Sequence, residues 1–299
     1  MNITKVINSA RTLVYLYRLG WESPHEMLVH RINKLFLGKD HARILKKEKE
    51  YDTLKKKYLR DGIWNFNGVK LPYNEMIGLE LLECFKDSLF VYCYFDDCYD
   101  KKIVDLNFSY EGPYGYKENH FDVTVHKGDV VVDAGAWIGD FSAYAAIKGA
   151  TCYAFEPNKK VLDLLYKTQQ MNPNIFVIEK ALGQVSDNIH FIQNCAHSGG
   201  AKIVMEAGDS FDAVQTTTID DFVLERELSR VDFIKADIEG FERYMLQGAT
   251  NTIREFSPKL AICTYHLQDD PLVLANLILD ANPKYRIVQR RCKLFAAVK

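Results

Sequence analysis

Short apolar runs alternate with segments of helical spacing from about residue 120 to the end of the chain. Such runs are typical of strands buried on both faces, and strands separated by helices predict a parallel sheet covered on both sides. The fold class is therefore α/β, doubly wound, with a mostly parallel Rossmann-like sheet. The predicted strands are 130–133, 152–155, 175–179, 233–236, 260–264, 285–289 and 294–298. The predicted helices are 140–148, 159–170, 219–227, 240–255 and 270–281.

The first part of the chain follows a different pattern. Residues 1–60 have helical spacing and many lysines, and 74–90 have helical spacing as well. Between them, 63–72 alternate apolar and polar residues around an Asn-Gly pair, which predicts a hairpin.

Segment 186–216 interrupts the rhythm of the second part, with alternation in NIHFIQN and glycines in HSGGAK. We expect an inserted hairpin there. The chain is thus divided into an N-terminal, mainly helical accessory region, 1–110, and a Rossmann-like domain, 111–299.

A chain of 299 residues, 47% hydrophobic and 26% charged, is long enough for a full α/β core with a smaller element beside it. It has no apolar run of about 18 residues, so we expect no membrane span. The amphipathic N-terminus carries Lys5, Arg11 and Arg18 and does not resemble a secretory signal. Of the seven cysteines, Cys152 and Cys263 fall inside predicted strands, which favours reduced core thiols in a cytoplasmic protein.

The net charge of −2 is unevenly distributed, because residues 1–60 hold 14 Lys and Arg against 6 Asp and Glu. A lysine-rich helix is most often a solvated face. The alternatives are recruitment of an anionic acceptor, of an anionic membrane surface, or of a partner chain, including a second copy of this one. No interleaving of aromatic and basic residues marks a stacking platform, so we expect no nucleic-acid binding.

The stretch DVVVDAGAWIGD, 129–140, leads from the first predicted strand into a helix. In doubly wound sheets, ligands bind beyond the carboxyl ends of the strands, at the switch point of the topology. Gly135 and Gly139 remove Cβ atoms where backbone must bend and approach a ligand. Glu156 ends the second strand, where a carboxylate is placed to accept hydrogen bonds from both hydroxyls of a ribose. The pattern predicts a nucleoside lying across the first two strands.

Two nucleoside cofactors compete for this place. A nicotinamide dinucleotide needs its pyrophosphate at a helix N-terminus behind a G-x-G-x-x-G turn. The spacing here is G-x-x-x-G, and Asp140 puts a negative charge where the pyrophosphate would sit. S-adenosylmethionine has no phosphate, and Asp133 could attract its ammonium group, so we favour it. The alternative without a ligand is a tight strand-to-helix connection capped by Asp140.

Seven segments occur in the order seen in FkbM-type S-adenosylmethionine-dependent methyltransferases, and the chain resembles that family over roughly 110–299. They are EGPYGY, KGDVVVDAGAWIGDFS, YAFEPN, EKALG, TTIDDF, VDFIKADIEGFERYMLQGA and ICTYHLQDD. The segment DIEGFE is the most specific of them. The resemblance implies a class I methyltransferase whose usual acceptors are hydroxyls of sugars, glycans and polyketide-like products.

Methyl transfer to an alcohol requires alignment of donor and acceptor, exclusion of water and removal of a proton. The catalytic candidates are His266, Asp237 and Glu239, at the carboxyl ends of the fourth and fifth strands. His266 has the unperturbed pKa closest to working pH, and its other explanation is a histidine bonded to backbone. Asp237 is favoured by the family pattern, and its other explanation is a helix N-cap. Glu242 lies in the first turn of a predicted helix, where we ascribe it to the helix dipole.

Asp237, Glu239 and His266 are also an alternative ligand set for a divalent cation that lowers the pKa of the acceptor hydroxyl. The spacing is no recognised metal signature, so we expect no metal. Lys235 is assigned to a sheet edge or an ion pair. The expected donor-binding residues are Glu111, Tyr114, Asp133, Gly135, Ala136, Gly139, Asp140, Glu156, Asn158, Ala181 and Asp237.

The leading hypothesis is an O-methyltransferase that uses S-adenosylmethionine and acts on a small-molecule or glycan hydroxyl. A catalytically silent nucleoside-binding scaffold and an NAD(P)-linked oxidoreductase are the rivals. Recognition of the acceptor is expected to fall to residues 1–110 and the 186–216 insertion, where no motif identifies it.

Overall fold

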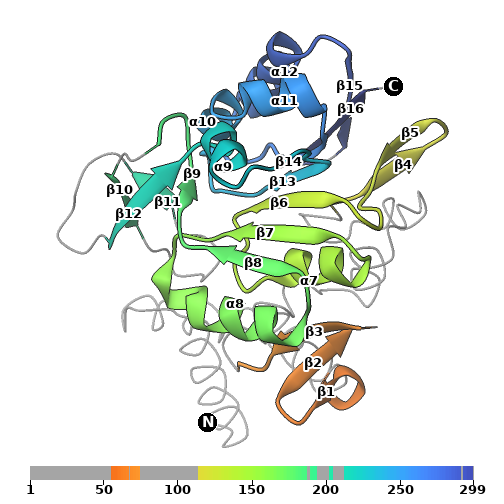
Figure 1. Ribbon diagram of the computed structural model, residues 1–299, viewed down its shortest axis with the longest axis vertical. Helices are drawn as coiled ribbons and strands as arrows, with labels where there is room; N and C mark the ends of the chain where they lie inside the picture. The colour runs from red at the N-terminus through yellow and green to blue at the C-terminus, as the bar shows by residue number, and fades with distance from the viewer. Residues whose placement is uncertain are drawn as a thin grey trace, which may run out of the picture.

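The computed structural model describes residues 55–66, 68–74, 114–186, 189–193, 202–204, 212–290 and 292–298. Their centre is a seven-stranded sheet with the order β15-β16-β14-β13-β6-β7-β8 (Figure 1). In chain order its strands are β6 Val130–Ala134, β7 Thr151–Phe155, β8 Ile175–Ile178, β13 Phe233–Ala236, β14 Lys259–Cys263, β15 Tyr285–Arg290 and β16 Lys293–Val298.

The five neighbouring strands β14, β13, β6, β7 and β8 are parallel to one another. At the edge beyond β14, β16 pairs antiparallel with β14, and β15 pairs antiparallel with β16. The predicted mostly parallel sheet is therefore confirmed. β6 pairs with β7 on one side and with β13 on the other, so the direction of winding reverses between β6 and β13. The carboxyl ends of β6, β7, β13 and β14 consequently meet at one edge, where this topology leaves room for a ligand.

Helices cover both faces of the sheet, as Figure 1 shows. Val131 and Cys152 pack toward the helices of one face, whereas Val132 and Phe155 pack toward those of the other. Alternation of this kind follows from the two-residue period of a strand and explains why the predicted strands are apolar throughout. The helices are α7 Asp140–Ile147 and α8 Lys159–Met171 on the first face, and α9 Ile219–Glu225, α10 Glu242–Gln247, α11 Thr250–Phe256 and α12 Asp270–Ala281 on the second.

The predicted single helix over 240–255 is wrong, because α10 and α11 are separate. The break lies at Gly248, where a Cβ would stand 2.1 Å from the backbone oxygen of Gly183. The Gly248 carbonyl accepts from the backbone N–H of Asp220, whose carboxylate in turn accepts from the backbone N–H of Thr252 at 2.8 Å. A contact with a distant segment therefore ends the first helix and caps the next.

The hairpin predicted over 63–72 is confirmed as β2 Ile63–Phe66 and β3 Val69–Pro72, with β1 Leu59–Arg60 beside β2. Its buried Trp64 and Phe66 belong to the same apolar core as α7 and α8. Most of the helical segments predicted at 1–60 and 74–90 lies outside the described residues, and the boundary at residue 110 stays a prediction.

The insertion forms a four-stranded sheet with the order β11-β10-β12-β9. β10 and β11 make the antiparallel hairpin that was predicted, and β12 pairs antiparallel to β10 and parallel to β9. The hairpin is thus one half of a larger element. Its strands are β9 Ala181–Leu182, β10 Ile189–Gln193, β11 Lys202–Val204 and β12 Asp212–Thr217.

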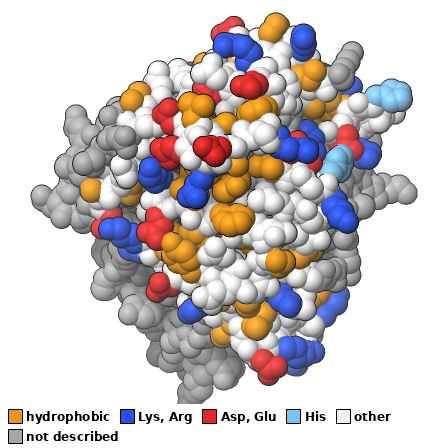
Figure 2. Space-filling model, viewed as in Figure 1, with side chains coloured by type: hydrophobic (Ala, Val, Ile, Leu, Met, Phe, Trp, Pro, Cys, Tyr) orange, Lys and Arg blue, Asp and Glu red, His pale blue; other side chains and the backbone are white. Residues whose placement is uncertain are grey.

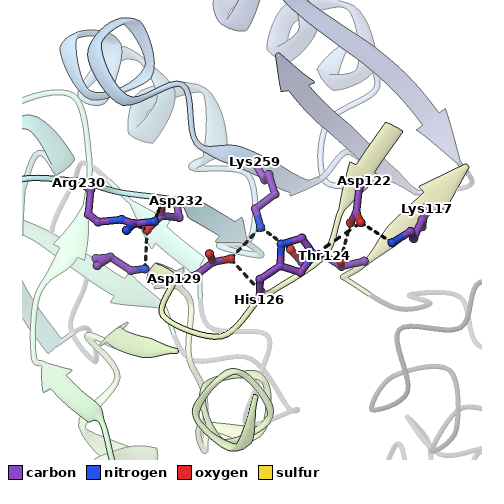
Figure 3. A network of polar contacts seen from close by, with 9 residues as sticks. Lys117, Asp122, Thr124, His126, Asp129, Arg230, Asp232 and Lys259 are labelled. Carbon is purple, nitrogen blue, oxygen red and sulfur yellow. Dashed lines mark hydrogen bonds and ion pairs between the residues drawn. The ribbon is translucent and has the colours of Figure 1, made fainter. Parts of the chain in front are cut away.

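A polar network joins the amino ends of the central strands, opposite the ligand edge (Figure 3). The Lys259 ammonium donates to the Thr124 carbonyl at 2.5 Å and to the Asp129 carboxylate at 2.7 Å. The Asp232 carboxylate accepts the backbone N–H of Val130 at 2.8 Å. These contacts fix the segment between β5 and β6. β5 Phe121–Val123 forms a second hairpin with β4 Tyr116–Glu118.

The face seen in Figure 2 carries acidic and basic side chains interspersed, without a patch of one sign. None of the described helices has the length and apolar content that crossing a bilayer requires. Among the described residues, Cys152, Cys263 and Cys292 form no disulfide bond, and Cys152 and Cys263 are buried in their strands.

Gly248→Ala is expected to lower the free energy of unfolding by about 1–3 kcal/mol, because the new methyl group meets rigid backbone. Gly183→Ala is the matched control, since its Cβ would make an ordinary contact at 3.5 Å with Phe241. Urea denaturation of both variants measures the difference. Equal stability of the two would show that the α10–α11 break does not depend on this close approach.

Candidate active site

The turn between β6 and α7 is built on left-handed backbone. Gly135, Trp137 and Gly139 have φ values of 77°, 50° and 82°. A Cβ on Gly135 would stand 2.0 Å from the backbone oxygen of Asp237, and the Gly135 N–H donates to the Phe155 carbonyl at 3.0 Å. The turn therefore rests on the ends of β13 and β7, and only a glycine allows that approach.

Glu156 follows β7 and turns back under this loop. One carboxylate oxygen accepts the backbone N–H of Trp137 and the other that of Asn158, each at 2.8 Å. Burial raises the pKa of Glu156 to about 7 and outweighs these two hydrogen bonds, which lower it. A carboxylate offers about four acceptor sites, so two remain for hydroxyl donors.

A buried ion pair lies beneath the turn. The Lys235 ammonium is 3.0 Å from Asp133 Oδ1, and Ser142 donates to Asp133 Oδ2 at 2.6 Å. Lys235 also donates to the Gly135 carbonyl at 2.6 Å. Burial opposes its charge, but Asp133 and two further carboxylates raise the pKa of Lys235. The ion pair expected for Lys235 is confirmed, although it lies on a central strand and not at a sheet edge, and Asp133 is occupied within the protein.

Tyr114 connects this pair to Asp237 at the end of β13. Its hydroxyl donates to Asp237 Oδ2 at 2.5 Å, and Tyr265 donates to Oδ1 at 3.1 Å. Two ammonium groups lie over the Tyr114 ring, that of Lys293 at 4.1 Å and that of Lys235 at 5.1 Å from its centroid. Burial would raise the pKa of Asp237, but the neighbouring cations, Lys235 and Lys293 foremost, lower it. Asp237 is therefore ionised at neutral pH.

His266 lies among three carboxylates. Its Nδ1 is 3.0 Å from Glu242 Oε1, while its Nε2 is 3.4 Å from Asp237 Oδ1 and 3.7 Å from Glu239 Oε2. Burial would lower the pKa of His266, yet these carboxylates raise it to about 9. The structure thus brings together the three predicted catalytic candidates.

Glu242 is the residue of this cluster that the sequence did not assign to the site. It is fully buried, and its two oxygens accept the backbone N–H groups of Ile238 at 2.8 Å and Gly240 at 3.0 Å. The φ of 98° at Gly240 turns the chain so that Glu242 faces His266. The signal was present in the segment DIEGFE, where a glycine between two acids permits such a return.

The other predicted donor-binding residues occupy separate places. Ala136 is buried within the turn, and Asp140 is partly exposed at the start of α7 behind an N-cap glycine without a side-chain cap. Asn158 caps α8 by accepting a backbone N–H at 3.1 Å. Ala181 is buried at the start of β9, and Glu111 lies outside the described residues.

The model of the methyltransferase FkbM domain matches residues 122–282, which is more than half of the sequence. This chain belongs to the FkbM methyltransferase family. Among curated proteins, hexuronic acid methyltransferase AglP of Haloferax volcanii is 28% identical to it over 154 residues. That match spans 51% of this FkbM chain and 62% of AglP.

Among solved structures, FkbM methyltransferase from Methylobacillus flagellatus KT is 22% identical, with a TM-score of 0.47 over 86% of this chain and 60% of its own. Fibrillarin from Aeropyrum pernix, solved with natively bound S-adenosyl-L-methionine, is 14% identical, and its TM-score is 0.37 over 58% of this chain and 68% of the fibrillarin chain. Assignment to the FkbM family rests on the match of the family model over more than half of the chain, and it bears out the resemblance found in the sequence.

Lys235→Met is expected to destabilise the FkbM fold by about 3–5 kcal/mol, because it leaves the Asp133 carboxylate buried without a countercharge. Adding Asp133→Asn should recover part of the loss. Lys160→Met, on the exposed side of α8, is the control. Chemical denaturation of the wild type, the two single variants Lys235→Met and Asp133→Asn, and the double variant gives the coupling energy, and additive effects would contradict a pair that acts as a unit.

Proposed function

We propose that the protein is an S-adenosylmethionine-dependent O-methyltransferase that methylates a hydroxyl of a sugar or glycan. The observation that carries the donor assignment is the buried Glu156 carboxylate, which keeps acceptor sites for a diol beside the glycine turn. Membership of the FkbM family supports the reaction class.

The residues around the turn fit this donor better than a dinucleotide. Asp140 opens α7 with a negative charge, and a pyrophosphate at that helix end would be repelled. Glu156 would hold the ribose hydroxyls, and Tyr114 and Asp237 lie beyond the turn, toward the methionine end. When bound, S-adenosylmethionine supplies a methyl group whose carbon–sulfur bond breaks as the new carbon–oxygen bond forms.

The chain must then orient the acceptor hydroxyl and promote loss of its proton. Asp237, which follows β13 at the edge where the donor would end and is ionised, supports removal of this proton. His266 follows β14 and keeps its own proton below its pKa of about 9, so it supports orientation of the acceptor and of Asp237. Tyr114 and Tyr265 fix the Asp237 carboxylate, and Glu242 fixes the imidazole from its other side. Held by these contacts, the two groups lose little entropy on meeting the acceptor.

The acceptor class rests on a relative. AglP carries hexuronic acid in its name, and its similarity covers about half of this chain. A sugar acid or a glycan that contains one is therefore the acceptor class we propose.

Affinity for S-adenosylhomocysteine is expected to fall as the pH drops below 7. In the protein without donor, the Glu156 carboxylate becomes protonated around its pKa of about 7. The two ribose hydroxyls can both donate only to the ionised carboxylate, so the protonated form binds the donor weakly. From pH 8 to pH 6, calorimetry should therefore record a loss of about tenfold. Glu156→Gln should bind about 1.5–3 kcal/mol more weakly at pH 8 and lose this pH dependence. A wild-type affinity that is constant from pH 6 to pH 8 would refute the donor assignment.

Asp237→Asn is expected to lower turnover by about 10²–10⁴-fold, the usual contribution of proton removal. His266→Ala should also lower turnover, because it removes the ring that orients Asp237 and the acceptor. Affinity for S-adenosylhomocysteine should stay within a few-fold. His120→Ala, on the exposed β4–β5 turn, is the matched control. The assay follows release of S-adenosylhomocysteine with hexuronic acid glycosides as acceptors. Full activity in both variants would mean that the proton leaves by another route.

A further inference from the structure

Three side chains from separate elements converge at the proposed acceptor site. Asp237 follows β13, Glu242 opens α10, and His266 lies beyond β14. One carboxylate oxygen of each acid and one ring nitrogen of His266 lie within 4.8 Å of one another. Ligand atoms of a single bound cation have separations of this order once the side chains close on it.

The imidazole is the second, independent observation. Its side chain is only 5% exposed. Glu242 Oε1 lies 3.0 Å from Nδ1, but within the described part of the chain neither ring nitrogen makes a hydrogen bond of good geometry. A buried polar ring without aligned partners is costly. A cation that binds one nitrogen, with release of the proton from that nitrogen to water, would remove that cost.

The two carboxylates are already fixed by other groups. Glu242 accepts two backbone N–H groups, and Asp237 accepts the hydroxyls of Tyr114 and Tyr265. Ligating carboxylates are commonly hydrogen-bonded in this way, which orients them before the metal arrives. Glu239, 3.7 Å from His266 Nε2, adds negative charge to the same place.

We propose that Asp237, Glu242 and His266 bind one divalent cation of the magnesium and manganese class. Carboxylate oxygens suit these hard ions, and manganese also accepts an imidazole. The inference rests on the proposed function, because the cation would bind the acceptor hydroxyl and lower its pKa, so that the proton leaves to water. The ligand set differs from the one expected from sequence by Glu242 in place of Glu239.

The test titrates Mn²⁺ into chelator-treated, full-length protein and measures free Mn²⁺ by electron paramagnetic resonance. We expect one saturable ion per chain. Glu242→Gln and Asp237→Asn should each weaken its binding tenfold or more, on the order of the loss when a metal-site partner is removed. Glu255→Gln, an exposed acid on α11, should bind like wild type. Circular dichroism establishes that each variant is folded, and if one is not, the other carries the comparison.

Absence of saturable Mn²⁺ binding, or binding that both variants retain, overturns the inference. A parallel titration of the metal-free protein with S-adenosylhomocysteine tests the proposed function separately from the cation site. Donor binding and methyl transfer that persist in chelator, without any Mn²⁺ site, reject the cation and keep the methyltransferase. Mn²⁺ binding that depends on Asp237 and Glu242, without affinity for S-adenosylhomocysteine, supports the cation and rejects the donor assignment.

Discussion

The ion pair between Asp133 and Lys235 is the constraint on which the rest of the site depends. It joins β6 to β13 where the winding of the sheet reverses, and both side chains are almost fully withdrawn from water. From there Lys235 reaches the carbonyl of Gly135 and the face of Tyr114. Because a buried charge is tolerated only when it is paired and hydrogen-bonded, the turn and the aromatic ring are held at fixed positions relative to the sheet.

The carboxyl ends of the strands on either side of this pair carry groups with different pKa shifts. Beyond β7, burial holds the pKa of Glu156 near 7. Beyond β13 and β14, the cations lower the pKa of Asp237 and the carboxylates raise the pKa of His266. Left-handed backbone occurs at Trp137, whose N–H binds Glu156, and at Glu239, which lies between Asp237 and Glu242 in the chain. Unusual backbone of this kind persists only where the surrounding contacts impose it, which is typical of functional sites.

The parts that the sequence predicted are those that depend on local pattern. The strands, the glycine turn, the β2–β3 hairpin and the positions of Glu156 and His266 at strand ends follow from periodicity and from glycine chemistry. The break at Gly248 and the orientation of Glu242 were not predicted, because the first depends on a contact with Gly183 and the second on a histidine beyond the next strand. Asp133 was assigned to a ligand because its partner, Lys235, is 102 positions away in the chain and adjacent only once the sheet forms.

The most direct test of the account is a crystal structure of the protein with S-adenosylhomocysteine. We predict both ribose hydroxyls within hydrogen-bond distance of the Glu156 carboxylate, and the sulfur atom on the side of the turn that faces Asp237 and His266. An adenosyl group bound away from Glu156, with that carboxylate still holding only the backbone of Trp137 and Asn158, would contradict it.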